Sequence, residues 1–334
     1  MFVDEIEIRK AIEQFETYNN LSISQYCHPS DVTSLSDSRD QDPYLADFYN
    51  RIINWLQICC DIDAEREFLR LLSQFNYLPS RHYRNGFSIL INKILENEKK
   101  ELSQILFITE AAENNCKSGG DEVRSAVGLH SRGILGNDAI RAYSKDRIPF
   151  DERIQVVVFI DDITGSGKTI YRMVNSCVEK NPWLRDKRIC IACLCGRQQK
   201  IKEKTKSLRK LGLDVEGYIG IPLNKCYGNS FEDNSRKTIT EKYEKCINSP
   251  ENWLANDTEK ECFMGFEQNQ LLVSFYYNTP NNTLSVFWRK TRVSPNPLFM
   301  RFPKPRPNLS WFAKRKKSFV RFAHSAFRIF KYGE

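Results

Sequence analysis

Apolar runs of strand length alternate with helical segments in the middle of the chain. Four runs, at 102–109, 156–160, 188–195 and 214–221, are rich in β-branched or other apolar residues. Strands buried on both faces read as continuous apolar runs, and crossover helices join parallel strands. The pattern therefore predicts an α/β fold with a parallel sheet, and a helix is expected over 170–179 after the second run.

The first 98 residues carry helical periodicity instead. Apolar residues recur at helical spacing over 6–15, 44–60 and 64–75, and a further helix is expected from Pro79-Ser80 onward. A polar segment over 22–42 is expected to be a loop. Core packing explains these apolar stripes, so residues 1–98 are predicted to be a helical N-terminal region without catalytic groups.

Three successive segments are predicted after residue 270: a strand with a turn, a linker and a helix. A strand is expected at 271–277, followed by a turn rich in Asn, Thr and Pro at 278–284. Prolines at 295, 297, 303, 305 and 307 predict a linker over 293–310. Residues 311–334 then read as a basic amphipathic helix with phenylalanines near one face.

Composition places the chain among globular proteins of a reducing compartment. Charged residues make up 28% and hydrophobic residues 41%, and no apolar run approaches the roughly 18 residues of a membrane span. The start lacks the apolar region of a secretion signal, so the eleven cysteines are expected to be reduced thiols in a cytoplasm. Cys193 and Cys195 are expected on one face of a strand and Cys190 on the other, as buried thiols without metal.

The net charge of +8 belongs to the C-terminal end. Residues 301–334 hold ten Lys or Arg and one Glu, so the first 300 residues sum to −1. The basic helix at 311–331 suits a nucleic acid, an acidic partner protein or a membrane surface. Docking on the chain's own domain explains the same pattern equally well.

The segment after the second strand carries the chemistry. Gly167-Lys168-Thr169 matches the end of a P-loop, but the position that a P-loop reserves for its first glycine is Asp162. A carboxylate there would repel phosphates, so a P-loop ATPase is disfavoured. Asp161 and Asp162 can instead accept hydrogen bonds from a ribose diol.

The residues after the two acids complete a phosphate site. Successive backbone N–H groups over 164–168 and the following helix N-terminus suit a phosphate, and Ser166 and Thr169 add hydroxyl donors. Acceptors for a diol next to donors for a phosphate predict a ribose 5-phosphate site. Its loop comprises Thr164, Gly165, Ser166, Gly167, Lys168 and Thr169.

Residues 158–169 resemble the phosphoribosyl-pyrophosphate loop of type I phosphoribosyltransferases. Ser166, Gly167 and Thr169 fall on the matching positions, whereas Gly165 replaces the usual Thr and Lys168 occupies the variable position. The chain most resembles the phosphoribosyltransferase-like effectors of bacterial conflict and retron antiphage systems. The stretch 278–288 also resembles theirs, and the whole resemblance covers about residues 45–290.

The resemblance implies a five-stranded parallel core with a hood, expected over 99–292, and a phosphoribosyltransferase activity that uses Mg²⁺ through the ligand. A non-catalytic nucleotide-binding regulatory module with the same fold is the alternative. Asp161 and Asp162 would be the catalytic acids. The implied pyrophosphate loop is Lys117, Ser118, Gly119 and Gly120, although the spacing of its glycines alone favours a surface turn. The implied hood residues that recognise the base are Asn278, Asn281, Asn282 and Trp288.

Overall fold

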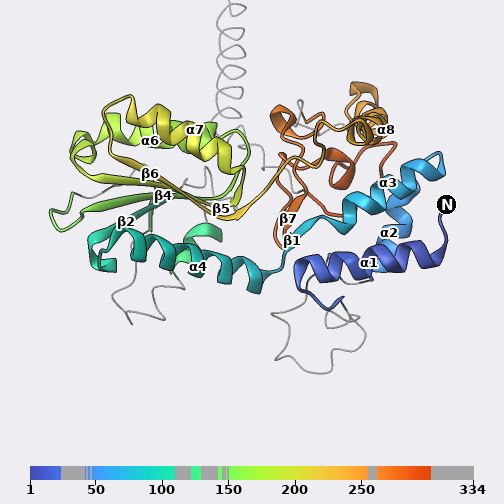
Figure 1. The fold of residues 1–334 in the computed structure, drawn as a ribbon, viewed down its shortest axis with the longest axis horizontal. Coiled ribbons are helices and arrows are strands. Elements are labelled where there is room, and N and C mark those ends of the chain that lie inside the picture. The colour runs from blue at the N-terminus through green and yellow to red at the C-terminus, as the bar shows by residue number, and fades with distance from the viewer. Residues whose placement is uncertain are drawn as a thin grey trace, which may run out of the picture.

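The protein forms two lobes that lie side by side (Figure 1). The computed structural model describes residues 1–23, 42, 44–45, 47–109, 122–128, 142–144, 148, 150–254 and 262–301. We call the part built on the five-stranded sheet the sheet lobe. We call the other part, which contains the N-terminal helices and residues 262–301, the helical lobe.

The sheet lobe confirms the predicted parallel α/β core. Its five strands are all parallel and lie in the order β3-β2-β4-β5-β6. The bounds are β2 Ile105–Thr109, β3 Ala142–Ser144, β4 Val156–Thr164, β5 Arg188–Gly196 and β6 Val215–Pro222. Two of the four expected strands, β5 and β6, have nearly the predicted ends. The central strand β4 continues four residues beyond its apolar run, through both acids to Thr164, because its pairing with β5 extends to Gly196. Leu102–Gln104 forms a 3₁₀ turn before β2, and β3 was not predicted.

Helices cover both faces of this sheet (Figure 1). Helices α6 (Lys168–Lys180) and α7 (Gln198–Arg209) lie on one face, and α4 (Ser80–Glu98) lies on the other. Alternate residues of β4 enter the two cores: Val157 and Phe159 pack toward α6 and α7, while Val158 and Ile160 pack toward α4. This alternation decides where the side chains at the end of β4 point.

The helical lobe is assembled from both ends of the chain. Helices α1 (Glu5–Asn19), α2 (Phe48–Leu56) and α3 (Ile62–Ser73) share one core with α8 (Phe231–Ile247) and with residues 264–299. A two-stranded parallel sheet of β1 (Asn76–Leu78) and β7 (Val273–Phe275) stands where the chain passes from α3 to α4. The predicted boundaries at 98 and 292 therefore do not coincide with the division between the lobes.

Two expectations for this lobe need correction. The strand predicted over 271–277 shortens to three residues, because its neighbours Tyr276 to Asn278 turn back in a tight loop closed by hydrogen bonds between Phe275 and Asn278. The start of the predicted linker, 293–301, is not a free connection. Leu298 and Phe299 are fully buried, and the Phe299 ring stacks on Phe75 at 4.6 Å between centroids.

The three cysteines of β5 are buried free thiols, as expected. Their predicted grouping is wrong: Cys190 and Cys195 pack in the core beside α4, and Cys193 packs in the core beside α6 and α7. Burial raises the pKa of each thiol, which keeps it protonated and unreactive. Among the described helices, none is long and apolar enough to cross a membrane.

Candidate functional site

The two acids stand at the carboxyl end of the central strand. β4 lies between β2 and β5, and Asp161 pairs in register with Cys193 of β5. By strand alternation, Asp161 belongs to the α6 face and Asp162 to the α4 face. Asp161 is half-buried and accepts a hydrogen bond from the Asp162 N–H at 2.9 Å. The carboxyl edge of a parallel sheet is where such folds bind ligands, so both acids border the expected ligand position.

Asp162 is held by a tyrosine of the helical lobe. The Tyr277 hydroxyl donates to the Asp162 carboxylate, and the Tyr83 hydroxyl of α4 lies 3.5 Å from that of Tyr277. Burial raises the pKa of Asp162, while the hydrogen bond from Tyr277 acts in the opposite direction by favouring the charged form. The hydrogen bond from Tyr277 fixes the orientation of the Asp162 carboxylate at the end of β4.

The loop between β4 and α6 is shaped by two glycines. Gly167 has a φ of 72°, the left-handed conformation that favours glycine, and it directly precedes the first residue of α6. The helix thus begins at Lys168, two residues earlier than predicted, and Lys168 and Thr169 belong to its first turn. The N–H groups of a first turn have no carbonyl partners within the helix. They carry the positive end of the helix dipole toward residues 164–167.

Glu267 of the helical lobe lies against this loop. Its carboxylate forms an ion pair with the Lys168 ammonium, and Ser166 also hydrogen-bonds to it. The bond from Lys168 is the largest cause of the lowered pKa of Glu267. The Glu267 carboxylate therefore binds Lys168 and Ser166, two donors that are expected to bind a phosphate.

Glu267 belongs to a strained segment, 264–270. Four of its non-glycine residues have positive φ values between 51° and 55°: Met264, Glu267, Gln268 and Gln270. Such residues cost about 1–2 kcal/mol each, so the surrounding structure must hold them. Buried Glu244 of α8 does so by accepting hydrogen bonds from the Met264 N–H at 2.8 Å and the Val286 N–H at 2.9 Å.

Asn282 is the predicted hood residue that the fold brings to the loop. A Cβ at Gly165 would overlap the Asn282 side-chain amide and would lie 2.7 Å from Nδ2 of Asn269. Gly165, which replaces the usual Thr of the resembled motif, therefore gives the space that these two amides fill.

The other predicted hood residues support the turn. The Asn281 carbonyl accepts from the Phe266 N–H at 2.7 Å, and the Asn278 carbonyl accepts from the Phe275 N–H at 3.1 Å. Trp288 is buried, and its indole N–H donates to the Thr283 carbonyl at 2.9 Å. The predicted pyrophosphate loop Lys117–Gly120 and the basic segment 311–331 lie outside the described residues.

The donor set suits a divalent ion that is bound mainly through a ligand. Among the described residues, no group of three His, Cys, Asp or Glu side chains is placed to hold a metal. Mg²⁺ prefers oxygen ligands and is commonly bound by one or two carboxylates together with substrate phosphates. The half-buried Asp161 carboxylate at the sheet edge fits that role.

Sequence reasoning missed four residues of this site, namely Tyr83, Glu267, Asn269 and Tyr277. Tyr277 ends an apolar stretch, where an aromatic residue is expected to belong to the core. Tyr83 lies among polar residues at the start of a predicted helix, and Glu267 and Asn269 lie in a polar stretch without a motif. No motif in the sequence links these four residues to the loop or to the acids.

Comparisons with known proteins give one match. Residues 53–301, most of both lobes, match the protein family described as PRTase-CE. No curated protein and no solved structure matches the chain. The matched range contains both acids, the loop and every helical-lobe residue that contacts the loop.

Proposed function

The chain belongs to the phosphoribosyltransferase-like family PRTase-CE, and from this premise we propose that residues 161–169 bind a ribose 5-phosphate group. One observation carries the proposal. Two carboxylates end the central parallel strand, and a glycine-shaped loop leads directly from them into the N-terminus of α6. Diol acceptors and phosphate donors thus lie next to each other along one edge of the sheet.

Each part of the site has a distinct task in this proposal. Asp161 and Asp162 accept hydrogen bonds from the two ribose hydroxyls, and Tyr277 holds the Asp162 carboxylate in place. The backbone N–H groups of the loop and the first turn of α6 bind the phosphate. Lys168 and Ser166 join that binding when Glu267 releases them.

We further propose transfer chemistry of the phosphoribosyltransferase type. In such a reaction the glycosidic carbon develops positive charge while pyrophosphate departs. The fixed carboxylates stabilise that charge more than they stabilise the ground state, because they need no reorganisation. Mg²⁺, when bound, would neutralise part of the pyrophosphate charge. The half-buried Asp161 carboxylate would hold the ion together with the ligand's oxygens.

We propose bacterial antiphage defence as the setting of this activity. The support is the resemblance of residues 158–169 and 278–288 to phosphoribosyltransferase-like effectors of retron systems.

A non-catalytic binding module is a second candidate, and one observation favours it. Side chains of the helical lobe already hold Asp162 and Lys168, through Tyr277 and Glu267 respectively. A ligand that displaces Glu267 would change the contact between the lobes, which is how a nucleotide-sensing switch works.

Calorimetric titration of the full-length chain with ribose 5-phosphate and with phosphoribosyl pyrophosphate plus Mg²⁺ tests the proposal. Asp161→Asn should weaken binding about tenfold, the value of a hydrogen bond to a charged group. Asp186→Asn, at an exposed turn after α6, is the matched control and should bind normally. Release of pyrophosphate distinguishes transfer from binding alone, and a wild-type chain that binds neither ligand would refute both candidates.

A further inference from the structure

Helix α7 presents a concentrated positive charge to solvent. Residues 197–210 hold seven Lys or Arg and one Glu. Ile201, Thr205 and Leu208 are buried against the sheet, so the opposite side of the helix is free. Lys202, Lys206 and Lys210 recur every four residues and are all exposed. They form one row along the helix. Among the described residues, none of the three has an ion-pair partner.

This helix touches the phosphate loop. A Cβ at Gly167 would lie 2.7 Å from Cγ of Lys204 and 3.5 Å from the Lys200 carbonyl oxygen. The Lys204 ammonium lies 5.5 Å from the ring centre of Tyr171 in α6, so its charge stays beside the loop. Helix α7 therefore runs from beside the loop for about 18 Å, at 1.5 Å for each of its 12 residues, and carries the basic row on its exposed side.

The same charge continues along the carboxyl edge of the sheet. Arg197 follows β5, and its N–H donates to the Thr164 carbonyl of the loop at 3.1 Å. Lys225 follows β6, and its pKa is lowered first by partial burial and then by the nearby cations Arg197, Lys237 and Lys200. Cations gathered at one edge of the sheet create a local positive potential, which attracts a polyanion.

We infer that the ribose-phosphate site takes the 3′-terminal nucleotide of an RNA strand, with upstream phosphates along the exposed face of α7. The inference rests on the proposed function. The terminal 2′,3′-diol would bind Asp161 and Asp162, and the phosphodiester that joins this nucleotide to the strand would bind residues 164–169.

Nucleotide geometry gives the direction of the strand. The diol and the 5′-phosphate lie at opposite ends of a ribose, and the upstream nucleotide is attached through that phosphate. A strand whose last diol sits on the acids must therefore leave the site on the phosphate side. At the loop, that side is occupied by Lys204 and Lys200 of α7.

The charge of the loop also suits a phosphodiester. Glu267 neutralises Lys168, which lowers the positive charge available to a ligand. A phosphomonoester carries about −1.5 to −2 at pH 7, whereas a diester carries a single charge. The loop in this state is thus better matched to the internal phosphate of a strand than to free ribose 5-phosphate. The diol requirement selects RNA, since DNA lacks the 2′-hydroxyl.

Fluorescence anisotropy with 5′-labelled oligouridylates of about six residues tests the inference on the full-length chain. RNA with a free 3′-terminal diol should bind about tenfold more tightly than the same RNA with a 3′-phosphate or than the matching DNA, because both lose hydrogen bonds to carboxylates. Lys202→Glu with Lys206→Glu should weaken diol-RNA binding about tenfold and reduce the salt dependence, as expected for lost phosphate contacts. Its affinity for ribose 5-phosphate should change less than twofold.

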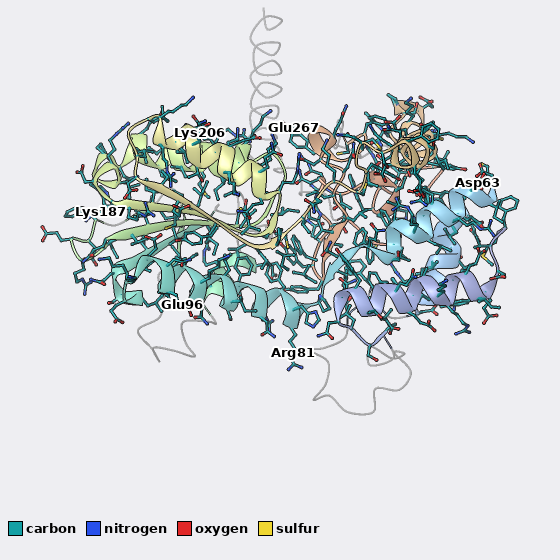
Figure 2. All side chains as sticks on the ribbon, in the orientation of Figure 1. Asp63, Arg81, Glu96, Lys187, Lys206 and Glu267 are labelled. Atoms are coloured by element: carbon teal, nitrogen blue, oxygen red, sulfur yellow. The ribbon has the colours of Figure 1, made fainter. Side chains whose placement is uncertain are left out.

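The control is a double variant with the same charge change on the far side of the sheet. Arg81→Glu with Lys93→Glu alters exposed residues of α4, and Figure 2 shows Arg81 and Lys206 on opposite sides of the molecule. It should bind RNA like the wild type, and the basic residues of 311–331 are present in every variant, so their contribution cancels. Equal affinity for all three strand ends, or an equal loss in both double variants, would overturn the inference. Absent binding of ribose 5-phosphate to the wild type would instead overturn the proposed function beneath it.

Discussion

The Tyr277 hydroxyl donates to the Asp162 carboxylate across 115 positions of sequence and joins the helical lobe to the end of the central strand. Tyr277 follows β7, whose pairing with β1 fixes its position. Tyr83 of α4 stands behind it, with its ring 5.5 Å from the Tyr277 ring. The carboxylate that the ligand needs is therefore oriented by the other lobe, so ligand binding depends on how the lobes meet.

Tyr277→Phe should weaken ribose 5-phosphate binding about tenfold, because it removes a hydrogen bond to a charged group. The pKa of Asp162 should rise further, since Tyr277 favours the charged carboxylate. The binding defect should then be larger at pH 6 than at pH 8. Titration calorimetry at both pH values measures it. Tyr276→Phe is the matched control, because Tyr276 bonds to Glu122 instead; a similar defect there would argue against a specific role for Tyr277.

Glu267→Gln should strengthen the binding of ribose 5-phosphate by up to about fivefold. The change removes a carboxylate that competes with phosphate for Lys168 and Ser166, and exposed ion pairs of this kind are worth up to about 1 kcal/mol. Isothermal titration with ribose 5-phosphate measures the gain. Glu203→Gln, which removes the carboxylate paired with Lys200 on α7, is a control of equal charge. A weaker affinity in Glu267→Gln would show that Glu267 supports the site and does not compete with the ligand.

Glu244 should make the protein less stable as the pH rises from about 5 to 7. Complete burial raises its pKa to about 7, although it accepts hydrogen bonds from Met264, Ser285 and Val286. Between the unfolded and folded pKa values the folded chain binds more protons, so the free energy of unfolding falls with rising pH. The total change for this group is about 3 kcal/mol.

Urea unfolding of Glu244→Gln at several pH values checks this expectation. The variant should show a flatter pH dependence than the wild type between pH 5 and 7, because the titrating group is gone. Glu241→Gln, on the same helix but partly exposed, should keep the wild-type slope. Parallel curves for wild type and Glu244→Gln would contradict the assignment.

Phe299→Ala should lower the free energy of unfolding by about 3–5 kcal/mol, the usual cost of removing a buried phenylalanine ring. The Phe299 ring lies 4.6 Å from that of Phe75 and 5.3 Å from that of Tyr77, inside the core of the helical lobe. Chemical denaturation measures the loss, and Phe231→Ala, at a ring that is 89% exposed, should change stability by less than about 0.5 kcal/mol. A mild effect would show that residues 293–301 are the passive linker that the prolines predicted.

The pattern of apolar and polar residues was sufficient to predict those elements whose residues all lie in one short stretch of sequence. The apolar runs predicted the parallel sheet, because strands buried on both faces must be continuously apolar. The stretch 158–169 predicted the position of the acids and the loop, since strand, turn and helix start follow one another there. The three-residue strand β3 was not predicted, because its apolar run is too short to stand out.

Tertiary structure alone decided which side chains meet these residues. Glu267, Asn269 and Asn282 reach the loop, and Tyr277 reaches Asp162. These contacts depend on how the helical lobe packs against the end of β4, and hydrophobic periodicity does not predict them. Tertiary packing also made the helical lobe from both chain ends, through the shared burial of α1–α3 and residues 264–299. The central strand's apolar run, the acids and the loop could be recognised from the sequence, because they follow one another in one short stretch. The contacts that orient Asp162 and occupy Lys168 were decided by packing between lobes, because they join residues about one hundred positions apart.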